Sequence, residues 1–254
     1  MNIDYSIIIP SYNQPDFIGK TLNNLKLLKQ KAANKNIVIE FLLFDSESDK
    51  LTQSVINEYR SFIDYVEIKK DKGQYDAINK GILKLRGRYW TWLNTDDYID
   101  INGFFNLHEE LQKDPSIDYI YGDIEIIDEK DQLIRKSECW PLTINMLVNK
   151  QPSVFQPGSF FKTARTKETG LLRENNCCFD YEYILRLLKR NARFKNINHT
   201  VAQFRLHSSS KSGSIVPQFI NEQLIISKQY GRKSISFLTF FLNLRKLKHY
   251  LFSK

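Results

Sequence analysis

Short apolar runs alternate with helical patterns along the first part of this chain, and each run stops at polar residues. The runs predict four buried strands, at residues 5–10, 37–44, 65–69 and 88–93. Between them, apolar residues recur at helical spacing, as in residues 16–30. Strands that alternate with helices in this way are joined by right-handed crossovers, so the pattern predicts an α/β fold with a largely parallel sheet.

Polar clusters follow all four predicted strands. They occupy residues 10–13, 45–48, 71–76 and 94–97. The carboxyl ends of parallel strands meet at one edge of a sheet, and ligands of such sheets bind beyond that edge. We therefore expect these clusters to form one binding site.

The pattern changes after residue 115, where strands and helices no longer alternate regularly. No repeat, low-complexity tract or linker interrupts the sequence. We expect one continuous domain at residues 1–231, with halves at 1–115 and 116–231, followed by a tail at 232–254. In the second half we expect strands at 118–122 and 201–206, a hairpin of 123–128 with 132–136, a strand-like run at 154–161, and helices at 142–149, 181–190 and 215–230.

The composition limits the classes of protein to consider. A chain of 254 residues with 42% hydrophobic residues can bury one substantial core. No apolar run reaches the roughly 18 residues that a membrane-spanning helix needs, and the first residues do not resemble a signal peptide. Three cysteines without metal-type spacing favour a reducing cytoplasm. The loops G-x-G-x-x-G and G-x-x-x-x-G-K-[ST] are absent, which argues against dehydrogenases and P-loop enzymes.

The segment Asn94-Thr95-Asp96-Asp97 carries the strongest chemical signal in the sequence. Two adjacent carboxylates after an apolar strand are costly unless a cation neutralises them. A divalent metal that carries a nucleotide diphosphate would do so. We assign Asp97 to a Mn²⁺ or Mg²⁺ ion and Asp96 to the metal or a ribose. The alternative is a polar turn without a ligand.

Carboxylates and lysines in the earlier loops could bind the rest of a nucleotide. Asp45 ends a strand and could accept hydrogen bonds from a nucleobase or a ribose, and Asp76 could hold the nucleoside from the start of a helix. Both could instead cap helices or stabilise turns. Lys72 and Lys80 could balance phosphate charge or lie in solvent.

A candidate general base lies in the second half. Asp180 and Glu182 fall at the start of a predicted amphipathic helix, where the helix dipole stabilises anions. We therefore expect Asp180 to have a lowered pKa and to be able to take a proton from an acceptor hydroxyl, with helix capping as the alternative. His207 follows a strand and could be structural. Arg205 could contact phosphate or simply pack its aliphatic stem.

Together these segments resemble family 2 glycosyltransferases of the GT-A fold, over roughly residues 4–212 and in the family's order. The matching segments are 9–13, 44–48, 71–81, 93–97, 121–123, 156–161, 179–187 and 205–207. The resemblance implies a GT-A type nucleotide-diphospho-sugar transferase fold, with a mostly parallel central sheet flanked by helices. It makes residues 1–115 the nucleotide-sugar half and residues 116–231 the acceptor half.

The resemblance also implies an inverting transfer of a sugar from a nucleotide-diphosphate donor, with Mn²⁺ or Mg²⁺ as cofactor. By position, Asp45 and Asp76 would bind the nucleoside, and Asp180 would be the general base. The metal would be held by Asp97, Asp96 and His207. The implied donor-binding residues are Pro10, Tyr12, Asn13, Asp45, Lys72, Gly73, Asp76, Lys80, Asn94, Asp96 and Arg205. The implied acceptor-side residues are Gln156, Pro157 and Glu182.

Several features qualify the resemblance. Ser46-Glu47 replaces a commoner pair of glycines, and Asn94 replaces a first aspartate. The Gln-x-x-Arg-Trp motif of processive synthases is absent, which favours a single transfer, and family frequency alone makes uridine the expected base.

A catalytically silent nucleotide-sugar-binding or assembly subunit is an alternative, although Asp97 and Asp180 are both present. A sugar nucleotidyltransferase should carry a Gly-rich loop, which residues 10–15 lack.

Residues 232–254 form a basic tail rich in Phe and Leu. No acidic residue follows Glu222, whereas Arg245, Lys246 and Lys248 lie close together. We expect an amphipathic helix on an anionic membrane surface, with packing on the domain or at a dimer seam as the alternative. This places a cytoplasmic enzyme on the inner face of the plasma membrane, beside a saccharide acceptor on polyprenyl diphosphate used for polysaccharide, O-antigen or capsule biosynthesis. No nucleic-acid-binding module accompanies the basic charge, so nucleic acid is not an expected partner.

Overall fold

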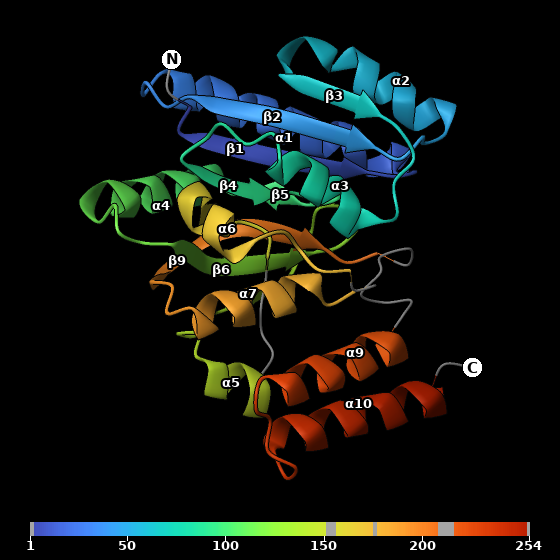
Figure 1. Cartoon of the computed structure of the whole chain (residues 1–254). Coiled ribbons are helices and arrows are strands. Elements are labelled where there is room, and N and C mark those ends of the chain that lie inside the picture. Colours follow the sequence, from blue (N-terminus) through green and yellow to red (C-terminus); the bar gives the residue numbers. More distant parts are fainter. Residues whose placement is uncertain (1–2, 151–155, 175–176, 208–215, 253–254) are drawn as a thin grey trace.

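One sheet runs through the domain (Figure 1). The computed structural model describes residues 3–150, 156–174, 177–207 and 216–252. The strands are β1 (Tyr5–Ser11), β2 (Ile39–Asp45), β3 (Tyr65–Ile68), β4 (Tyr89–Trp92), β5 (Tyr98–Ile99), β6 (Tyr119–Ile127), β7 (Leu133–Ser137), β8 (Phe160–Lys162) and β9 (Phe194–Arg205). Within the described residues they pair in the order β3-β2-β1-β4-β8-β6-β9-β5, with β7 beside β6.

Helices cover both faces of this sheet. They are α1 (Pro15–Ala33), α2 (Lys50–Glu58), α3 (Gln74–Ile82), α4 (Ile101–Lys113), α5 (Ile144–Asn149), α6 (Thr163–Thr169), α7 (Phe179–Lys189), α9 (Val216–Gln229) and α10 (Phe237–Phe252), with a short 3₁₀ turn at Arg60–Phe62. Figure 1 shows α7 between the sheet and a lower group made of α5, α9 and α10.

The first half of the sheet is parallel, as the sequence predicts. β1 pairs in parallel with β2 and β4, and β2 pairs in parallel with β3. The register sets Ser11 opposite Asp45 at the ends of β1 and β2. All residues of both strands are buried, which explains why their sequences are mainly apolar; the buried Ser6 and Glu40 between them are joined by a hydrogen bond.

The second half of the sheet is mixed. β8 is antiparallel to β4 and to β6, and β5 is antiparallel to β9, whereas β6 and β9 are parallel. The expectation of a mostly parallel sheet is confirmed for the first four strands, whereas the rest of the sheet combines one parallel pair, β6 and β9, with antiparallel pairs. The strands predicted at 118–122 and 123–128 are one strand, β6, whose pairing with β9 shifts register on either side of Asp123. The predicted hairpin with β7 is confirmed.

The two faces of the sheet are packed by different helices. Alternate residues of β1 point to opposite sides: Ile7 and Ile9 belong to the core under α1 and α4, whereas Ile8 belongs to the core under α3 and α7. α4 was not expected from the sequence. It begins at Asp100, whose carboxylate accepts a hydrogen bond from Gly103 N at 2.6 Å.

The C-terminal helices form a hairpin of their own. Ile220 of α9 packs against Leu238 and Leu242 of α10, and all three are buried. The helix predicted for the tail is thus confirmed as a helix. Among the described helices, none combines the length and apolarity that crossing a bilayer requires.

Candidate functional site

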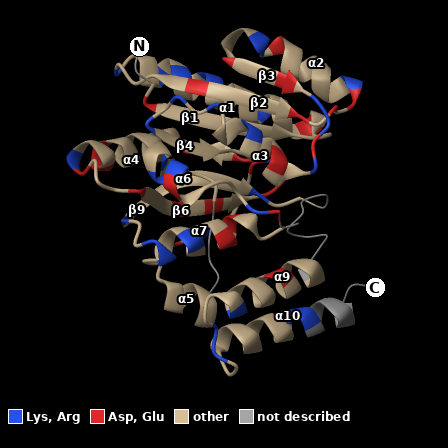
Figure 2. Cartoon of the chain, viewed as in Figure 1, with Lys and Arg blue, Asp and Glu red and all other residues tan. Residues whose placement is uncertain are grey.

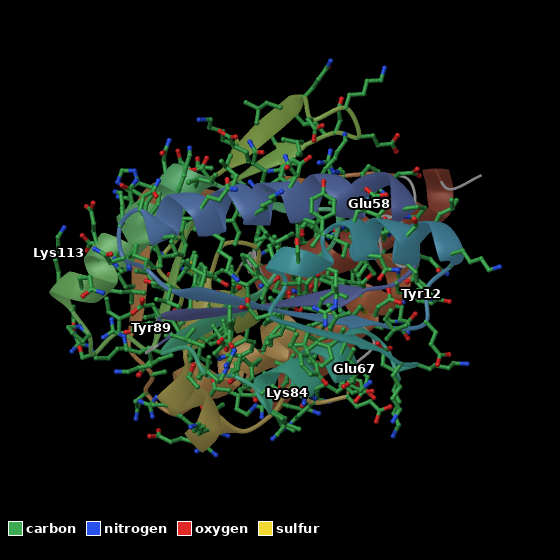
Figure 3. All side chains as sticks on the ribbon, turned by 90° about the horizontal axis from the view of Figure 1, so that it is seen from above. Tyr12, Glu58, Glu67, Lys84, Tyr89 and Lys113 are labelled. Carbon is green, nitrogen blue, oxygen red and sulfur yellow. The ribbon has the colours of Figure 1, made fainter. Side chains whose placement is uncertain are left out.

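The polar clusters after β1, β2, β3 and β4 meet at one edge of the sheet, as predicted. In Figure 3, Tyr12 and Glu67 lie toward this end, and Tyr89, at the start of β4, lies toward the opposite end. Hydrogen bonds join the clusters in sequence. Ser11 Oγ donates to Asp45 Oδ2 (2.8 Å). The next links run from Asp71 N to Ser46 Oγ (3.1 Å) and from Gln74 Nε2 to Asn94 Oδ1 (2.5 Å).

Asp45 stabilises the loop that follows β2. Its Oδ2 accepts a hydrogen bond from Ser48 Oγ (2.6 Å), its Oδ1 accepts one from Ser48 N (2.9 Å), and the residue is 1% exposed. Such contacts favour the alternative in which Asp45 stabilises a turn over the one in which it binds a nucleoside. Asn13 continues the loop network, because its N donates to Ser48 Oγ and its Oδ1 accepts from Asp49 N. Pro10 is buried within β1, whereas Tyr12 projects from the edge with 62% of its surface exposed.

The loop before α3 is a tight turn. Gly73 has φ +117°, a conformation that favours glycine, and its N donates to Asp71 Oδ1 (2.8 Å). Asp76 Oδ2 accepts a hydrogen bond from Lys72 N (3.1 Å). The side chain of Lys72 is exposed beside this turn, whereas the Lys80 ammonium lies 3.3 Å from the Glu67 carboxylate. Of the two predicted phosphate-balancing lysines, Lys72 is therefore the one that faces solvent.

The two adjacent aspartates after β4 have different surroundings. Asp97 is fully buried: its Oδ1 accepts from Arg205 N (3.0 Å) and its Oδ2 accepts from Asn94 Nδ2 (3.1 Å). Burial first, and then the neighbouring Asp96, raise the pKa of Asp97 well above its usual value. Asp96 keeps part of its side chain exposed, and its Oδ2 lies 2.9 Å from His207 Nε2. This geometry favours Asp96 as the carboxylate that faces a metal and gives Asp97 the role of holding the loop.

Arg205 supports the same loop from inside the protein. Its side chain is 0% exposed, and Nε donates to Asp96 O (2.9 Å). Nη1 donates to Asp128 O (2.8 Å), and Nη2 lies 2.6 Å from Asp131 Oδ1. The guanidinium also lies over the rings of Phe17 and Tyr98. Arg205 has no exposed surface for the predicted donor contact, so its structural role is the one that the geometry supports.

Asp180 reaches this edge from the second half of the chain. It lies in the first turn of α7, and the preceding Phe179 packs on Trp92 at the end of β4, with ring centroids 6.0 Å apart. Burial raises the pKa of Asp180 to about 6, and the hydrogen bond from Tyr181 N (2.7 Å) lowers it by less. The predicted lowering of this pKa is therefore wrong, because burial outweighs the helix N-terminus.

The three predicted acceptor-side residues are buried. Gln156 is 4% exposed and its Nε2 donates to Trp92 O (2.6 Å). Pro157 is buried next to it. Glu182 is 2% exposed and pairs with Arg186 (3.0 Å) and with Tyr230 Oη (2.8 Å). These placements favour structural roles over the predicted acceptor contacts.

Sequence reasoning missed the small polar residues that join the loops. Ser11 bonds Asp45, Ser48 accepts a hydrogen bond from Asn13 N, and Gln74 bonds Asn94, so that each joins two strand ends. Ser11 could have been found, because in parallel pairing it stands level with Asp45. Gln74 could not, since nothing in the spacing shows that its amide reaches the end of β4.

Solved structures with the same architecture are known. The chain aligns with a Staphylococcus aureus TarS fragment crystallised with UDP-GlcNAc, at TM-score 0.69 and 18% identity, covering 98% of this chain and 73% of that one. It also aligns with a mannosyltransferase from Pyrobaculum calidifontis in complex with GDP-Man and Mn²⁺, at TM-score 0.64 and 15% identity, covering 94% and 69%. The fold is therefore of the GT-A type, as expected.

Sequence relatives match about half of the chain. An uncharacterized glycosyltransferase of Rickettsia conorii is 34% identical over 131 residues, which are 51% of this chain and 21% of that protein. The poly-β-1,6-N-acetyl-D-glucosamine synthase of S. aureus is 28% identical over 123 residues, 48% of this chain and 28% of the synthase. The matched residues thus cover only 21% and 28% of the length of these two relatives. The profile described as glycosyl transferase family 2 matches residues 6–205, so the chain belongs to this family.

Proposed function

We propose that this protein transfers a sugar from a nucleotide-diphosphate donor to a saccharide acceptor, with inversion at the anomeric carbon and with Mn²⁺ or Mg²⁺ as cofactor. One observation carries the proposal. The partly exposed Asp96, backed by His207, stands at the end of β4 beside the loops that follow β1, β2 and β3. The solved complexes support a nucleotide-sugar donor, since TarS was crystallised with UDP-GlcNAc and the mannosyltransferase with GDP-Man and Mn²⁺.

The donor set fits a hard divalent cation. Carboxylate oxygen is a ligand that both Mg²⁺ and Mn²⁺ accept, and these ions usually take one or two protein carboxylates together with phosphate oxygens. Asp96 would hold the ion, and His207 would join it or orient the carboxylate, as it does here. When bound, the ion supplies positive charge that stabilises the departing diphosphate.

Asp180 is the proposed general base. Its carboxylate would take the proton of the acceptor hydroxyl while the acceptor oxygen forms a bond to the anomeric carbon of the donor sugar. The bond between that carbon and the diphosphate oxygen breaks, and its electron pair leaves with the nucleotide diphosphate. A carboxyl with a pKa of about 6 is ionised at neutral pH yet basic enough to share the proton in the transition state.

A donor panel tests this function. We would measure nucleotide release from UDP-, GDP- and dTDP-sugars with Mn²⁺, with Mg²⁺ and with EDTA, for the wild-type protein and for Asp96→Asn. We expect one donor, with a uridine nucleotide the first candidate, to be hydrolysed slowly, and we expect EDTA and the substitution to abolish the reaction. Silence across the panel, also with a lipid-diphosphate saccharide acceptor present, would overturn the proposal in favour of a silent binding or assembly subunit.

We further propose that the C-terminal hairpin rests on an anionic membrane and so brings the enzyme to an acceptor on polyprenyl diphosphate, at the inner face of the plasma membrane. The outer face of α10 carries an exposed apolar stripe at helical spacing, made of Phe237, Phe240, Phe241 and Leu244. Its inner face already packs on α9, so the helix is apolar on two sides. No partner within the described residues covers the stripe.

Charge favours a membrane as the occupant of this surface. The chain has no acidic residue after Glu222, and Figure 2 shows basic but no acidic residues on α10. Arg232 and Lys233 precede α10, and Arg245 and Lys246 lie near its other end. Each such residue near anionic lipid contributes about 1 kcal/mol. A stripe of aromatic residues flanked by basic ones is typical of a helix that lies in the membrane interface.

Vesicle binding tests this surface. We expect the protein to sediment with vesicles of phosphatidylglycerol and phosphatidylcholine at low salt, and the double variant Phe237→Asp/Phe240→Asp to remain in solution. Leu51→Asp removes an equally exposed leucine from the start of α2 and should bind like wild type. A wild-type protein that ignores these vesicles, or a dimer in solution that the double variant converts to monomer, would contradict the membrane proposal.

A further inference from the structure

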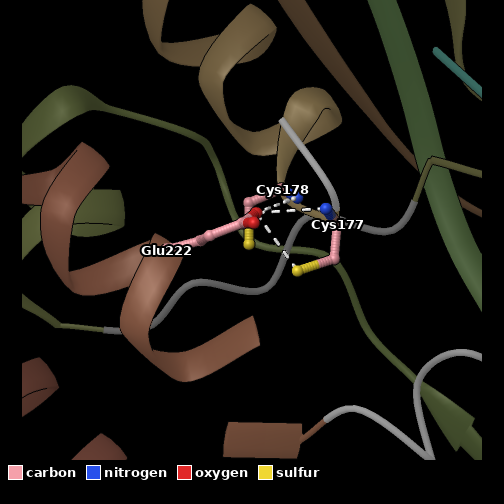
Figure 4. A group of neighbouring side chains, drawn as sticks. All are labelled: Cys177, Cys178 and Glu222. Atoms are coloured by element: carbon pink, nitrogen blue, oxygen red, sulfur yellow. Dashed lines mark hydrogen bonds between the residues drawn. The ribbon is translucent and has the colours of Figure 1, made fainter. Parts of the chain in front are cut away.

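Two cysteines and one glutamate gather outside the site described above. Cys177 and Cys178 lie just before α7, and Glu222 reaches them from α9 (Figure 4). The two sulfur atoms and a carboxylate oxygen lie within 4.8 Å of one another. This cluster adjoins the helix that carries Asp180, so what it does bears on the proposed general base.

Hydrogen bonds occupy both sulfur atoms of this cluster. Cys177 Sγ donates to Glu222 Oε2 (3.1 Å), and Cys178 Sγ donates to Phe219 O (3.5 Å). Burial raises the pKa of the Cys177 thiol to about 12 and raises that of Cys178 further. In this arrangement the thiols are hydrogen-bond donors and the Glu222 carboxylate is the acceptor at the centre of the cluster.

The carboxylate of Glu222 acts as a cap for α7. The backbone N–H groups at the start of a helix have no partner within the helix. At α7 the side chain of the N-cap residue makes no capping hydrogen bond. Instead, Glu222 Oε2 accepts hydrogen bonds from the N–H of the N-cap residue Cys178 (3.2 Å) and from that of Cys177 just before it (3.0 Å). A negative charge at this end also interacts favourably with the helix dipole.

A second contact ties the same two helices together. Tyr230, at the end of α9, donates its hydroxyl to Glu182 Oε1 (2.8 Å), and Lys189 lies over the Tyr230 ring at 5.8 Å. Glu222 and Tyr230 therefore hold α7 from two points along α9. In the sequence, Asp180 lies between the two contacted positions, two residues after Cys178 and two before Glu182.

We propose that Glu222 is a positioning residue that fixes the first turn of α7 and thereby sets the place and the burial of the Asp180 carboxylate. The inference rests on the proposed function, in which Asp180 is the general base. It assigns to α9, which lies beyond the residues matched by the family profile, a part in the transfer step. The loops that follow β1, β2, β3 and β4, which we call the donor-binding edge after their proposed role, are held by other contacts and take no part in this positioning.

Two substitutions at this position and one neighbour test the proposal. Glu222→Ala removes the acceptor, Glu222→Gln keeps an oxygen in its place, and Asn221→Ala changes an exposed neighbour on the same helix. A misplacement of about 1 Å can cost about 10²-fold in rate, so we expect kcat of Glu222→Ala to fall on that order while KM for the donor stays unchanged. Glu222→Gln should recover most of kcat, and Asn221→Ala should match wild type.

The pH profile separates positioning from simple destabilisation. Opening of the first turn would expose Asp180 to water, so its pKa would fall toward the ordinary value and the acid limb of kcat in Glu222→Ala would move to lower pH. Amide hydrogen exchange over residues 177–181 should become faster in the same variant, whether or not the protein is active. A variant with wild-type kcat, acid limb and exchange would overturn the proposal, and so would a loss of kcat that Gln fails to restore.

The outcome for Asp180→Asn keeps the two proposals apart. If Asp180→Asn is inactive but Glu222→Ala behaves like wild type, the positioning role alone fails. If Asp180→Asn is fully active, the general base is misassigned, and the hydrogen-exchange result still decides whether Glu222 caps α7.

Discussion

The donor-binding edge and the start of α7 are built in different ways. At the edge, each loop is closed by side chains of its own strand end or of the neighbouring one, as Ser48 does for Asp45. At α7, the cap comes from Glu222, which lies 45 residues further along the chain than Cys177. The first region is therefore specified by local turn chemistry on a parallel sheet, and the second by packing between distant helices.

The carboxylates of the two regions differ in the same sense. Asp97 is buried but accepts hydrogen bonds from both Arg205 N and Asn94 Nδ2. Asp180 is stabilised mainly by the backbone N–H groups of its own turn, and burial raises its pKa to about 6. Burial raises the pKa of both carboxylates, so the difference lies in their partners: Asp97 is held by groups of two other residues, whereas Asp180 accepts its hydrogen bond within its own turn.

The largest effect is expected at the start of α7. Asp180→Asn removes the proposed base but keeps the size of the side chain, so kcat should fall by about 10²–10⁴-fold. KM for the donor should stay near the wild-type value, because the donor-binding edge is intact. Steady-state kinetics with the donor found in the panel would measure both.

Asp118→Asn is the matched control for that experiment. Asp118 is a buried aspartate that pairs with Arg165 at the opposite end of β4 from the site. It should lower stability with little change in kcat. An Asp180→Asn enzyme with more than a tenth of wild-type kcat would contradict the assignment of the general base to the start of α7.

Much of the donor-binding edge could be predicted from the sequence, because parallel strands place their ends together and turn residues mark those ends. The prediction went wrong where burial decided the role. The spacing of Asp96 and Asp97 does not show which one points inward, and that depends on Arg205, whose backbone N–H bonds Asp97 from another strand. The strand β5 and the antiparallel pairing of β8 were not predicted, since these two short strands leave little periodicity to read.

The next effect concerns the edge. If Asp96 binds the metal, His207 orients it, and His207→Ala should weaken apparent metal affinity by about 10–100-fold. The affinity would be measured from the Mn²⁺ dependence of donor hydrolysis. At saturating Mn²⁺ the kcat of His207→Ala should return to the wild-type value, whereas that of Asp180→Asn should stay low. A variant whose Mn²⁺ dependence matches wild type would remove His207 from the metal site.

A smaller effect, on stability, is expected from the residue that supports the edge from inside. Arg205→Met keeps the aliphatic stem but leaves the acceptors Asp96 O and Asp128 O without their donors. Each buried acceptor left unpaired costs about 1–3 kcal/mol of unfolding free energy. Arg193→Met removes an exposed pair with Asp114 and should cost no more than about 1 kcal/mol. Urea denaturation would compare them, and equal costs would contradict the buried role of Arg205.

The smallest effect is a pH dependence that only the α7 region should show. If Asp180 is the general base, it must be ionised to act, so kcat should fall about tenfold per pH unit below a pKa of about 6. The folded pKa is raised above the unfolded value, so the ionised group opposes folding above pH 6, and this cost fades as the pH drops toward 4. Asp180→Asn should therefore be more stable than wild type at pH 7.5 and equally stable near pH 4. Thermal unfolding at both pH values would show it, and a difference that grows on acidification would mean that Asp180 is stabilised by a partner rather than strained by burial.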